Sequence, residues 1–330
     1  MNTFGRIFRV SIFGESHGNC VGVLIDGVPA GLKLVHSDLK KDMARRNPGI
    51  IGTTARKECD IPDIRSGVFN GITTGAPILI IFENQDVRSK DYEALTDTPR
   101  PGHADFTANI KFGGFNDYRG GGHLSGRLTA GLVAAGTIAK KILGNIKIDA
   151  RLIEAGGNKK IEQEIKKTYT NKDSIGGVVE CRINKLPTGL GEPFFDSVES
   201  VISHIVFAIP GIKGIEFGTG FRSAELLGSE YNDRIIDRNG KTKTNNSGGI
   251  NGGITNGNEV IFRIAVRPSA SIAKQQETIN LKTGKSEKIF IQGRHDTCFA
   301  VRIPVIIEAV SAIAIADLMM LEQKVPRVVR

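Results

Sequence analysis

The segment Pro304–Leu321, with the sequence PVIIEAVSAIAIADLMML, is apolar on nearly every side when it is drawn as a helix. A helix of that kind is buried all round. Proline suits its first turn, where a missing N–H is harmless. Glu308 and Asp317 interrupt the run, which is too short and too charged to span a bilayer comfortably. The segment therefore predicts a central helix.

A second long apolar helix is predicted from Ser125 to Leu143, and it carries Gly126, Gly131 and Gly136. An interior glycine costs about 1 kcal/mol relative to alanine, so we attribute these glycines to close packing. Both helices are placed in the centre, with the antiparallel sheets of each half outside. The predicted fold is an α+β (β-α-β) sandwich with central helices and an internal pseudo-twofold repeat, rather than a doubly wound parallel sheet.

The repeat rests on five pairs of segments that follow one another in the same order. The pairs are Gly22–Val28 with Val178–Ile183, Pro29–Leu32 with Pro187–Leu190, Gly67–Gly75 with Gly249–Gly257, Arg100–Gly102 with Arg267–Ser269, and Gly122–His123 with Arg294–His295. Convergent turn chemistry is the alternative. We expect one domain over residues 1–330, made of halves at roughly 1–150 and 151–330, with the paired turns meeting near the axis.

The net charge of +9 favours an anionic partner, such as nucleic acid, acidic lipid or a phosphorylated metabolite. No long basic run or RNA-binding aromatic motif is present, so nucleic acid is the weaker choice. The four cysteines have neither metal-ligand nor redox spacing. The first residues carry no apolar signal core. We expect a soluble cytoplasmic protein that binds no metal, no membrane and no nucleic acid.

Four of the six histidines lie in polar turns that contain glycine. They are His17 in Gly14–Gly18, His103 in Arg100–Asp105, His123 in Gly120–His123, and His295 in Gly293–Asp296. Glycine lets backbone approach a ligand closely, arginine supplies fixed positive charge, and histidine titrates near neutral pH. Together the turns indicate a site for an anionic ligand that also needs proton transfer.

Several of these motifs have other interpretations. Gly14–Gly18 matches the G-x-S-x-G elbow of serine hydrolases, but a strand rather than the required helix is predicted after Ser16. The glycines at 120–122 lead into a helix, whose N–H groups can bind an anion. Arg45 and Arg46 could bind a ligand or simply stabilise a helix C-terminus. A serine hydrolase through Ser16 and a non-catalytic phosphoanion- or nucleic-acid-binding protein remain the alternatives.

The assembled motifs closely resemble those of the chorismate synthase family, from Phe4-Gly5 to about Leu321. The segments that carry the resemblance are Gly14–Gly18, Asp26–Gly31, Arg45–Gly49, Arg100–Asp105, Asp117–Gly122, Gly189–Pro193 and Gly293–Asp296. Several are long and rare, so the resemblance is specific.

The resemblance implies a lyase of the shikimate pathway, the route to the aromatic amino acids. Its reaction is the 1,4-trans elimination of phosphate from 5-enolpyruvylshikimate 3-phosphate to give chorismate. Reduced FMN is required without net redox change. NADPH is expected as an indirect reductant, which makes NADP an expected ligand class. FAD is the second flavin that the resemblance brings into consideration. The resemblance also implies a homotetramer. No extra reductase segment is found, so we expect reduced flavin from an external reductase or another outside source.

The resemblance further assigns residues. His17 protonates the departing phosphate, His103 protonates or stabilises the reduced flavin, and Asp296 helps the flavin N5 act as a base. Arg46, Arg100 and Arg127 hold the substrate or NADP. The residues expected to contact FMN are His123, Leu124, Ser125, Gly252, Arg267, Pro268, Ser269, Ala270, Ser271 and Arg294.

Three positions depart from the family pattern. His123-Leu124 replaces the usual Arg-Ser at a flavin contact. Ile51 stands near a place where an arginine is common, which weakens a second NADPH contact. Pro210-Gly211 replaces a small polar pair near the flavin.

Overall fold

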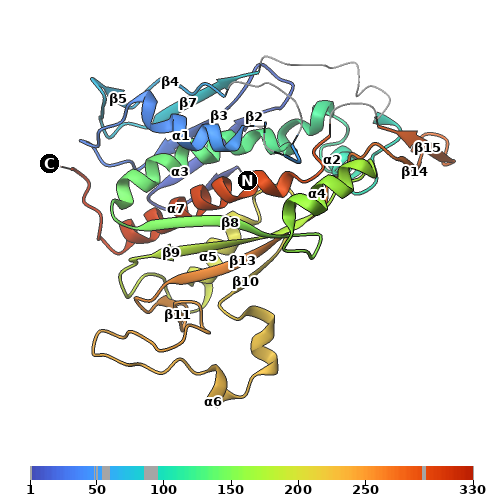
Figure 1. The fold of residues 1–330 in the computed structure, drawn as a ribbon. Helices are drawn as coiled ribbons and strands as arrows, with labels where there is room; N and C mark the ends of the chain where they lie inside the picture. Colours follow the sequence, from blue (N-terminus) through green and yellow to red (C-terminus); the bar gives the residue numbers. More distant parts are fainter. Residues whose placement is uncertain are drawn as a thin grey trace.

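The computed structural model describes residues 2–47, 49, 51–53, 60–84, 96–291 and 295–329. Two antiparallel sheets enclose a layer of helices (Figure 1). The upper sheet has the order β1 (Thr3–Phe4), β2 (Arg9–Gly14), β3 (Cys20–Asp26), β7 (Ile78–Glu83), β4 (Asp63–Ile64). The lower sheet has the order β10 (Ile212–Phe217), β13 (Val260–Val266), β9 (Gly177–Asn184), β8 (Lys147–Ala155).

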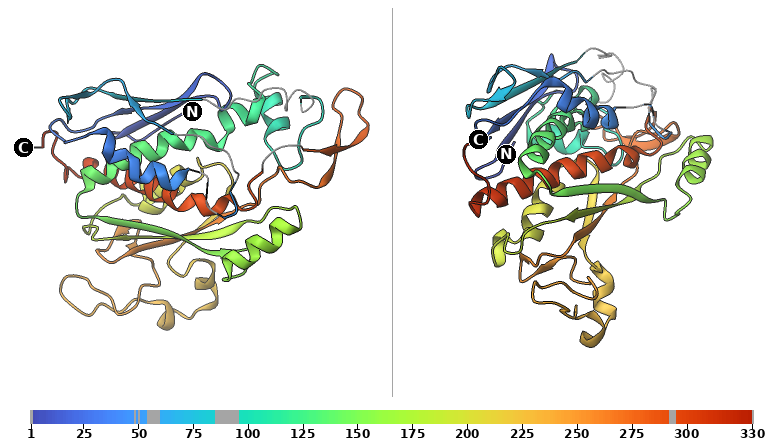
Figure 2. Two further views of the ribbon diagram at one scale, coloured as in Figure 1. Left: turned by 45° about the horizontal axis from the view of Figure 1, so that its top comes forward. Right: turned by 60° about the vertical axis from the view of Figure 1, so that its left-hand side comes forward.

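The helices α3 (Thr129–Leu143) and α7 (Ile303–Leu321) run side by side between the sheets, as the further views in Figure 2 also show. Helix α1 (His36–Arg46) packs on α3, and α5 (Val198–Val206) packs on α7. The other helical elements are η2 (Arg119–Leu124), η3 (Gly126–Leu128), η4 (Phe194–Asp196), η5 (Gly220–Glu225), η6 (Phe299–Arg302), α2 (Asp105–Lys111), α4 (Ile161–Thr170) and α6 (Gly228–Tyr231). Three hairpins complete the fold: β5 (Val68–Phe69) with β6 (Ile72–Thr73), β11 (Ile250–Asn251) with β12 (Ile254–Thr255), and β14 (Gln275–Ile279) with β15 (Ser286–Phe290).

The predicted sandwich with central helices is confirmed, and two of the three helix glycines do pack closely. A Cβ on Gly136 would collide with the backbone of Ala309 in α7, and one on Gly131 would lie 3.0 Å from the carbonyl oxygen of Gly22. Gly126 has nothing within 4 Å of its Cβ position. It belongs to η3, because α3 begins only at Thr129, and Ser125 caps η3 rather than the long helix.

The pseudo-twofold repeat is visible in both topology and hydrogen bonding. The orders β2-β3-β7-β4 and β8-β9-β13-β10 are equivalent. Thr73 Oγ1 donates to Pro29 O (2.6 Å) and accepts from the Leu32 N–H (2.9 Å). Thr255 Oγ1 repeats this with Pro187 O (2.7 Å) and the Leu190 N–H (2.9 Å). The division of a single domain near residue 150 remains a prediction.

Two buried carboxylates tie α7 to the rest of the chain. Glu308 accepts from both terminal nitrogens of Arg45 (2.6 Å each) and from Lys140 Nζ (2.9 Å). Asp317 accepts the backbone N–H groups of residues 6–8 at 2.7–3.1 Å. Buried charges persist only when they are paired or hydrogen-bonded. The span Phe299–Leu321 is long and apolar enough to cross a membrane, but it is 78% buried in its most apolar stretch, as a core helix is.

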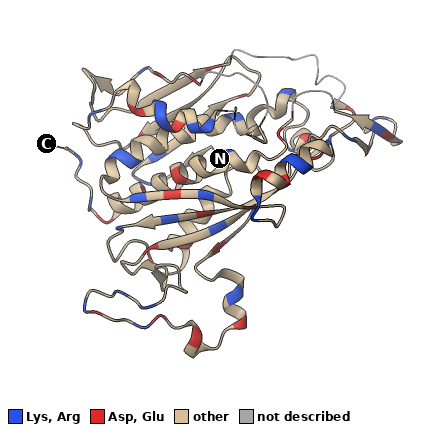
Figure 3. Cartoon of the chain, in the orientation of Figure 1, with Lys and Arg blue, Asp and Glu red and all other residues tan. Residues whose placement is uncertain are grey.

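Charged residues are mixed rather than separated on the lower sheet (Figure 3). Glu180 of β9 accepts from Arg182 (2.9 Å) on the same strand and from Arg263 of β13 (3.3 Å). The positive charges of Arg182 and Arg263 are thus partly balanced by Glu180 along these strands.

Candidate active site

Both central helices begin at the same end of the sandwich, near α2 and the β14–β15 hairpin (Figure 1). Segments η2 and η3 lead into α3, and η6 leads into α7. The N-terminus of a helix carries partial positive charge and N–H groups without intrahelical partners. This end is therefore electrostatically suited to an anion, and most of the predicted site residues gather here.

A glycine loop brings the two predicted catalytic histidines to one place. Gly120 and Gly121 have positive φ angles of 59° and 87°. A Cβ on Gly120 would collide with the ring of His17, and one on Gly121 would lie 3.5 Å from Cε1 of His103. Consecutive Cα atoms are only about 3.8 Å apart. His17 and His103 therefore border the same short stretch of backbone, although they are far apart in the sequence.

The hydrogen bonds around His17 fix the orientation of its ring. Ser16 Oγ donates to the carbonyl oxygen of Arg119 (3.1 Å), and it lies 3.1 Å from His17 Nδ1. A hydroxyl has one proton and a carbonyl can only accept. Nδ1 of His17 is therefore the donor to Ser16, which leaves Nε2 as the ring nitrogen that this hydrogen bond does not use. The residue is 4% exposed, so bulk water has little access to it.

His103 belongs to a buried ionic cluster on the turn before α2. Its Nδ1 lies 2.6 Å from Oδ1 of Asp105. Arg100 donates from Nε and one terminal nitrogen to the two carboxylate oxygens of Asp105 (2.7 and 2.8 Å). Burial alone raises the pKa of Asp105, but the hydrogen bonds from Arg100 and His103 outweigh it and hold that pKa far below its ordinary value. Asp105 is therefore ionised and can only accept, so His103 Nδ1 donates to it. The 3.0 Å approach of an Arg100 terminal nitrogen to the same Nδ1 is then a contact and not a hydrogen bond.

The same arginine links the two halves of the repeat. Arg100 donates to Ser271 Oγ (3.2 Å), so the turn Arg267–Ser271 lies against its counterpart from the first half. The Arg267 N–H in turn donates to Gly211 O (2.9 Å), which places Pro210-Gly211 beside that turn. Convergence of these paired turns agrees with the repeat predicted from the sequence.

Two further predicted arginines share one buried carboxylate. Asp60 accepts from Arg46 through Oδ2 and from Arg127 through Oδ1, and all three side chains are at least nine-tenths buried. Arg46 also donates to Thr129 Oγ1 (3.2 Å) at the start of α3, and Arg127 donates to Asn84 Oδ1 (3.1 Å). Asp60 and Asn84 were not predicted, because neither lies in a recognisable motif.

The pair Arg45-Arg46 divides between two environments. Arg46 joins Asp60, whereas Arg45 turns to Glu308 of α7. The hydrogen bond from Arg45 to Glu308 outweighs burial and raises the pKa of that guanidinium above its ordinary value. Arg45 thus serves packing between α1 and α7, while Arg46 lies in the site.

Four other predicted residues have mixed placements. His123 Nδ1 lies 2.8 Å from Gly14 O, and Nε2 lies 3.1 Å from Asn2 Oδ1. Asp296 pairs with Arg302 of η6. Gly252 lies in the β11–β12 hairpin, at a distance from α2 (Figure 1). Arg294 lies outside the described residues.

The serine-hydrolase alternative can be tested against this geometry. The strand β3 follows Ser16, so the helix that a nucleophile elbow requires is not there. Across the described ranges, no three His, Cys, Asp or Glu side chains are grouped so that they could hold a metal ion.

Comparisons with known proteins agree with one another. The family model described as chorismate synthase matches residues 8–320. A chorismate synthase of Chitinophaga pinensis is 60% identical over 329 residues and covers 99% of each chain. One from Methanocaldococcus jannaschii is 44% identical, covering 97% of this chain and 96% of the relative. A solved structure described as a crystal structure of chorismate synthase matches with a TM-score of 0.75 at 26% identity, covering 96% of this chain and 93% of the other.

Proposed function

Since the chain belongs to the chorismate synthase family, we propose that its reaction takes place at the end of the sandwich where α3 and α7 begin. The chain is a lyase of the shikimate pathway that converts 5-enolpyruvylshikimate 3-phosphate into chorismate by 1,4-trans elimination of phosphate, and the family uses a reduced flavin. Different side chains at this end bind the flavin, bind the substrate and transfer protons.

The flavin is proposed to be FMN, held mainly by the turn Arg267–Ser271. This turn combines a half-buried cation with two hydroxyls, and it contacts Arg100, which also contacts His103. Such a donor set fits an anionic, ring-bearing cofactor. The bound reduced flavin supplies electron density for loss of the allylic phosphate. His123–Ser125 and Arg294 are proposed as further contacts, whereas Gly252 lies in the β11–β12 hairpin away from this end of the sandwich and is left out of the proposed flavin site. The ring nitrogens of His123 are already engaged by Gly14 and Asn2, so its backbone is the better contact.

The substrate anion is proposed to bind near Arg46, Arg127 and Arg100. Asp60 accepts from both of these arginines, so two guanidinium groups converge on one buried carboxylate at this place. Arg100 is balanced by Asp105. The N-termini of α3 and α7 add partial positive charge. Together these groups favour a multiply anionic substrate without leaving a large uncompensated charge in the apo protein.

His17 is proposed as the acid that protonates the departing phosphate. Its Nδ1–H is held by Ser16, so Nε2 is the atom that delivers the proton. The carboxylate of Asp105 holds Nδ1–H of His103 in the same way, and Nε2 of His103 lies 3.6 Å from the Cβ position of Gly121. His103 is proposed to hold a proton at that atom towards the reduced flavin. Asp296, oriented by Arg302, is proposed to assist removal of the substrate proton.

The observation that carries the proposal is that Gly120 and Gly121 contact His17 and His103 respectively. The test combines the full-length chain with 5-enolpyruvylshikimate 3-phosphate and FMN reduced by dithionite without oxygen. Phosphate and chorismate are expected in equal amounts. Activity that survives replacement of both histidines would overturn the proposed site.

Three further points are proposed from the family resemblance. The reduced flavin comes from an external source, with NADPH as an indirect reductant. The assembly is a homotetramer, and the compartment is the cytoplasm. Light scattering measures the mass of the assembly, and a tetramer is the expected result. An oxygen-free assay with NADPH in place of dithionite is expected to give no chorismate unless a separate reductase is added.

A further inference from the structure

A cavity of about 320 Å³ lies beside the proposed reaction site but is lined by different residues. Its walls are the loop 51–53 after α1, the outer part of α4, and the turn around His295 and Thr297. The volume falls at the lower end of the range for small-molecule sites. His295, one of the four turn histidines singled out in the sequence, lines it. Among the described residues, none of those proposed above to bind flavin or substrate or to transfer protons does so.

Backbone hydrogen bonds hold the segments that line this cavity in place. The Cys298 N–H donates to Gly52 O (2.9 Å), and the Ile175 N–H donates to Thr297 O (2.8 Å). Gly52 has a φ of +94°, and a Cβ there would lie 3.1 Å from Ile165 of α4. The loop therefore approaches α4 closely because residue 52 is glycine. A cavity with walls fixed in this way is formed before any ligand arrives.

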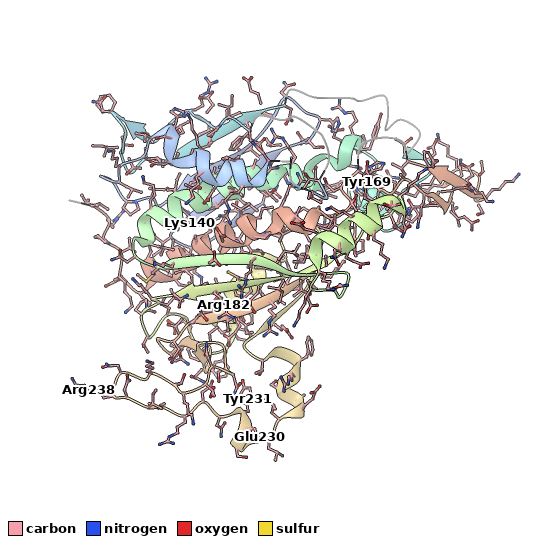
Figure 4. The ribbon with its side chains drawn as sticks, in the orientation of Figure 1. Lys140, Tyr169, Arg182, Glu230, Tyr231 and Arg238 are labelled. Atoms are coloured by element: carbon pink, nitrogen blue, oxygen red, sulfur yellow. The ribbon has the colours of Figure 1, made fainter. Side chains whose placement is uncertain are left out.

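The lining combines an apolar floor with a cationic rim. Ile165, which is 2% exposed, and Ile51 supply the apolar part of the lining. Lys166 and Tyr169 follow on α4, where Figure 4 labels Tyr169. Within the described part of the chain no carboxylate pairs with Lys166, and the lining contains no Asp or Glu. A small anion is therefore favoured over a cation.

His295 adds a second polar group with a defined proton. Its Nε2 lies 3.0 Å from the carbonyl oxygen of Ile291, which can only accept, so Nε2 carries a hydrogen. Nδ1 is then the ring atom that can accept a hydrogen bond, or donate one when the ring is protonated. One ammonium and one imidazole, without the fork of an arginine, suit a single carboxylate better than a phosphate dianion.

We propose that this cavity binds a small organic carboxylate with an apolar ring. The carboxylate lies near Lys166 and His295, and the ring lies between Ile165 and Tyr169. The proposal rests on the cavity alone and does not depend on the assignment of catalytic residues. Because His295 directly precedes Asp296, and the loop 51–53 follows Arg46, an occupant of the cavity contacts both segments that lead into the reaction site.

The test measures binding of benzoate to the full-length protein by saturation-transfer NMR and calorimetry, without flavin or substrate. Benzamide, which has the same shape and no charge, is the matched ligand. Lys166→Ala and Tyr169→Ala are the test variants. Lys167→Ala is the control, because Lys167 is adjacent on the same helix but pairs with Glu164 (3.3 Å) and does not line the cavity. All three residues are exposed, so the variants are expected to fold.

Benzoate is expected to bind the parent protein and Lys167→Ala equally, and to bind the two test variants about three- to tenfold more weakly. Benzamide is expected to bind more weakly than benzoate. Binding should persist when 5-enolpyruvylshikimate 3-phosphate and reduced FMN are added. Equal affinity for benzamide, equal binding by Lys166→Ala and Lys167→Ala, or displacement of benzoate by the substrate would each overturn the proposal.

Discussion

His103 and Asp105 lie on one turn, with Nδ1 of the histidine 2.6 Å from Oδ1 of the aspartate. The same carboxylate receives two hydrogen bonds from Arg100, and that arginine also reaches Ser271 in the second half of the chain. Asp105 thus fixes the proton of the histidine and the position of the arginine at once. Its effect on the reaction is indirect, because it acts through these two partners.

Asp105→Asn is expected to lower kcat by about 10²-fold, within the range for loss of general acid–base catalysis. The amide can turn its NH₂ group toward Nδ1, so the other tautomer of His103 is favoured. NMR of ring-labelled histidine should therefore show the proton moving from Nδ1 to Nε2. Asp173→Asn, which removes an exposed ion pair with Lys274, is the control and should change neither measurement. A loss of activity with an unchanged tautomer would contradict the orienting role.

The lowered pKa of Asp105 also predicts how stability depends on pH. A carboxylate with a folded-state pKa below its unfolded value of about 3.9 stabilises the protein above that pH and loses this contribution as the pH falls. The loss of unfolding free energy caused by Asp105→Asn should therefore be about 1 kcal/mol smaller at pH 3 than at pH 7. Urea unfolding of the parent protein and of Asp105→Asn at both pH values measures this difference in unfolding free energy. An equal loss at both would show that the pKa of Asp105 is not depressed.

Gly120→Ala is expected to abolish most activity, because the new Cβ would occupy the position of the His17 ring. Gly144→Ala is a matched control, since Gly144 also has a positive φ of 60° but has nothing within 4 Å of its Cβ position. Gly120 lies in the left-handed helical region (φ 59°, ψ 17°), where alanine costs about 1–2 kcal/mol, and Gly144 (φ 60°, ψ −103°) lies outside it, so the control carries at least as much backbone strain. Only the first should lose turnover in the oxygen-free chorismate assay. Similar turnover in both variants would remove the argument that the glycine loop positions His17.

Asp60→Asn is expected to destabilise the fold by about 3–5 kcal/mol, because Arg46 and Arg127 would remain buried without their shared counter-charge. Asp63→Asn is the control. Its pair with Arg65 is exposed, and exposed pairs contribute about 0–1 kcal/mol. Denaturant unfolding compares the two variants. Substrate or inorganic phosphate, which is proposed to bind near these arginines, should recover part of the lost stability of Asp60→Asn by binding only the folded protein.

His17→Ala and His103→Ala are each expected to lower turnover by about 10²–10⁴-fold. His36→Ala at the exposed start of α1 should have no effect. Product formation with dithionite-reduced FMN measures all three variants. If either site variant keeps more than about a tenth of the parent turnover, that histidine does not have the proton-transfer role assigned to it.

The architecture followed from the sequence because two patterns were strong. Apolar residues all round the segment that forms α7 required a buried position, and the repeated turns required equivalent topology in both halves. The second long helix was expected to begin at Ser125, but Gly126–Leu128 form the short helix η3 first. Local capping preference could not reveal that α3 starts only at Thr129.

The site was only partly predictable for a different reason. Turns with histidine, arginine and glycine are visible in the sequence, and the two halves were expected to meet. Asp60 and Asn84 contact Arg46 and Arg127 only through the tertiary fold. The adjacent arginines 45 and 46 point to different partners, since successive residues on a helix lie on different faces. The sequence could not show that Gly14 and Asn2 engage the ring of His123, a residue that stays a proposed flavin contact through its backbone.

The hydrogen bonds that Asp317 accepts from residues 6–8 have a consequence for synthesis on the ribosome. The connection between β1 and β2 is among the first segments to be translated, yet its backbone N–H groups obtain their acceptor only when almost the entire chain has emerged. Contacts between such distant residues are slow to form. The N-terminal strands therefore cannot complete their hydrogen bonds until α7 has been synthesised. Early termination within α7 would leave the N–H groups of residues 6–8 without their acceptor.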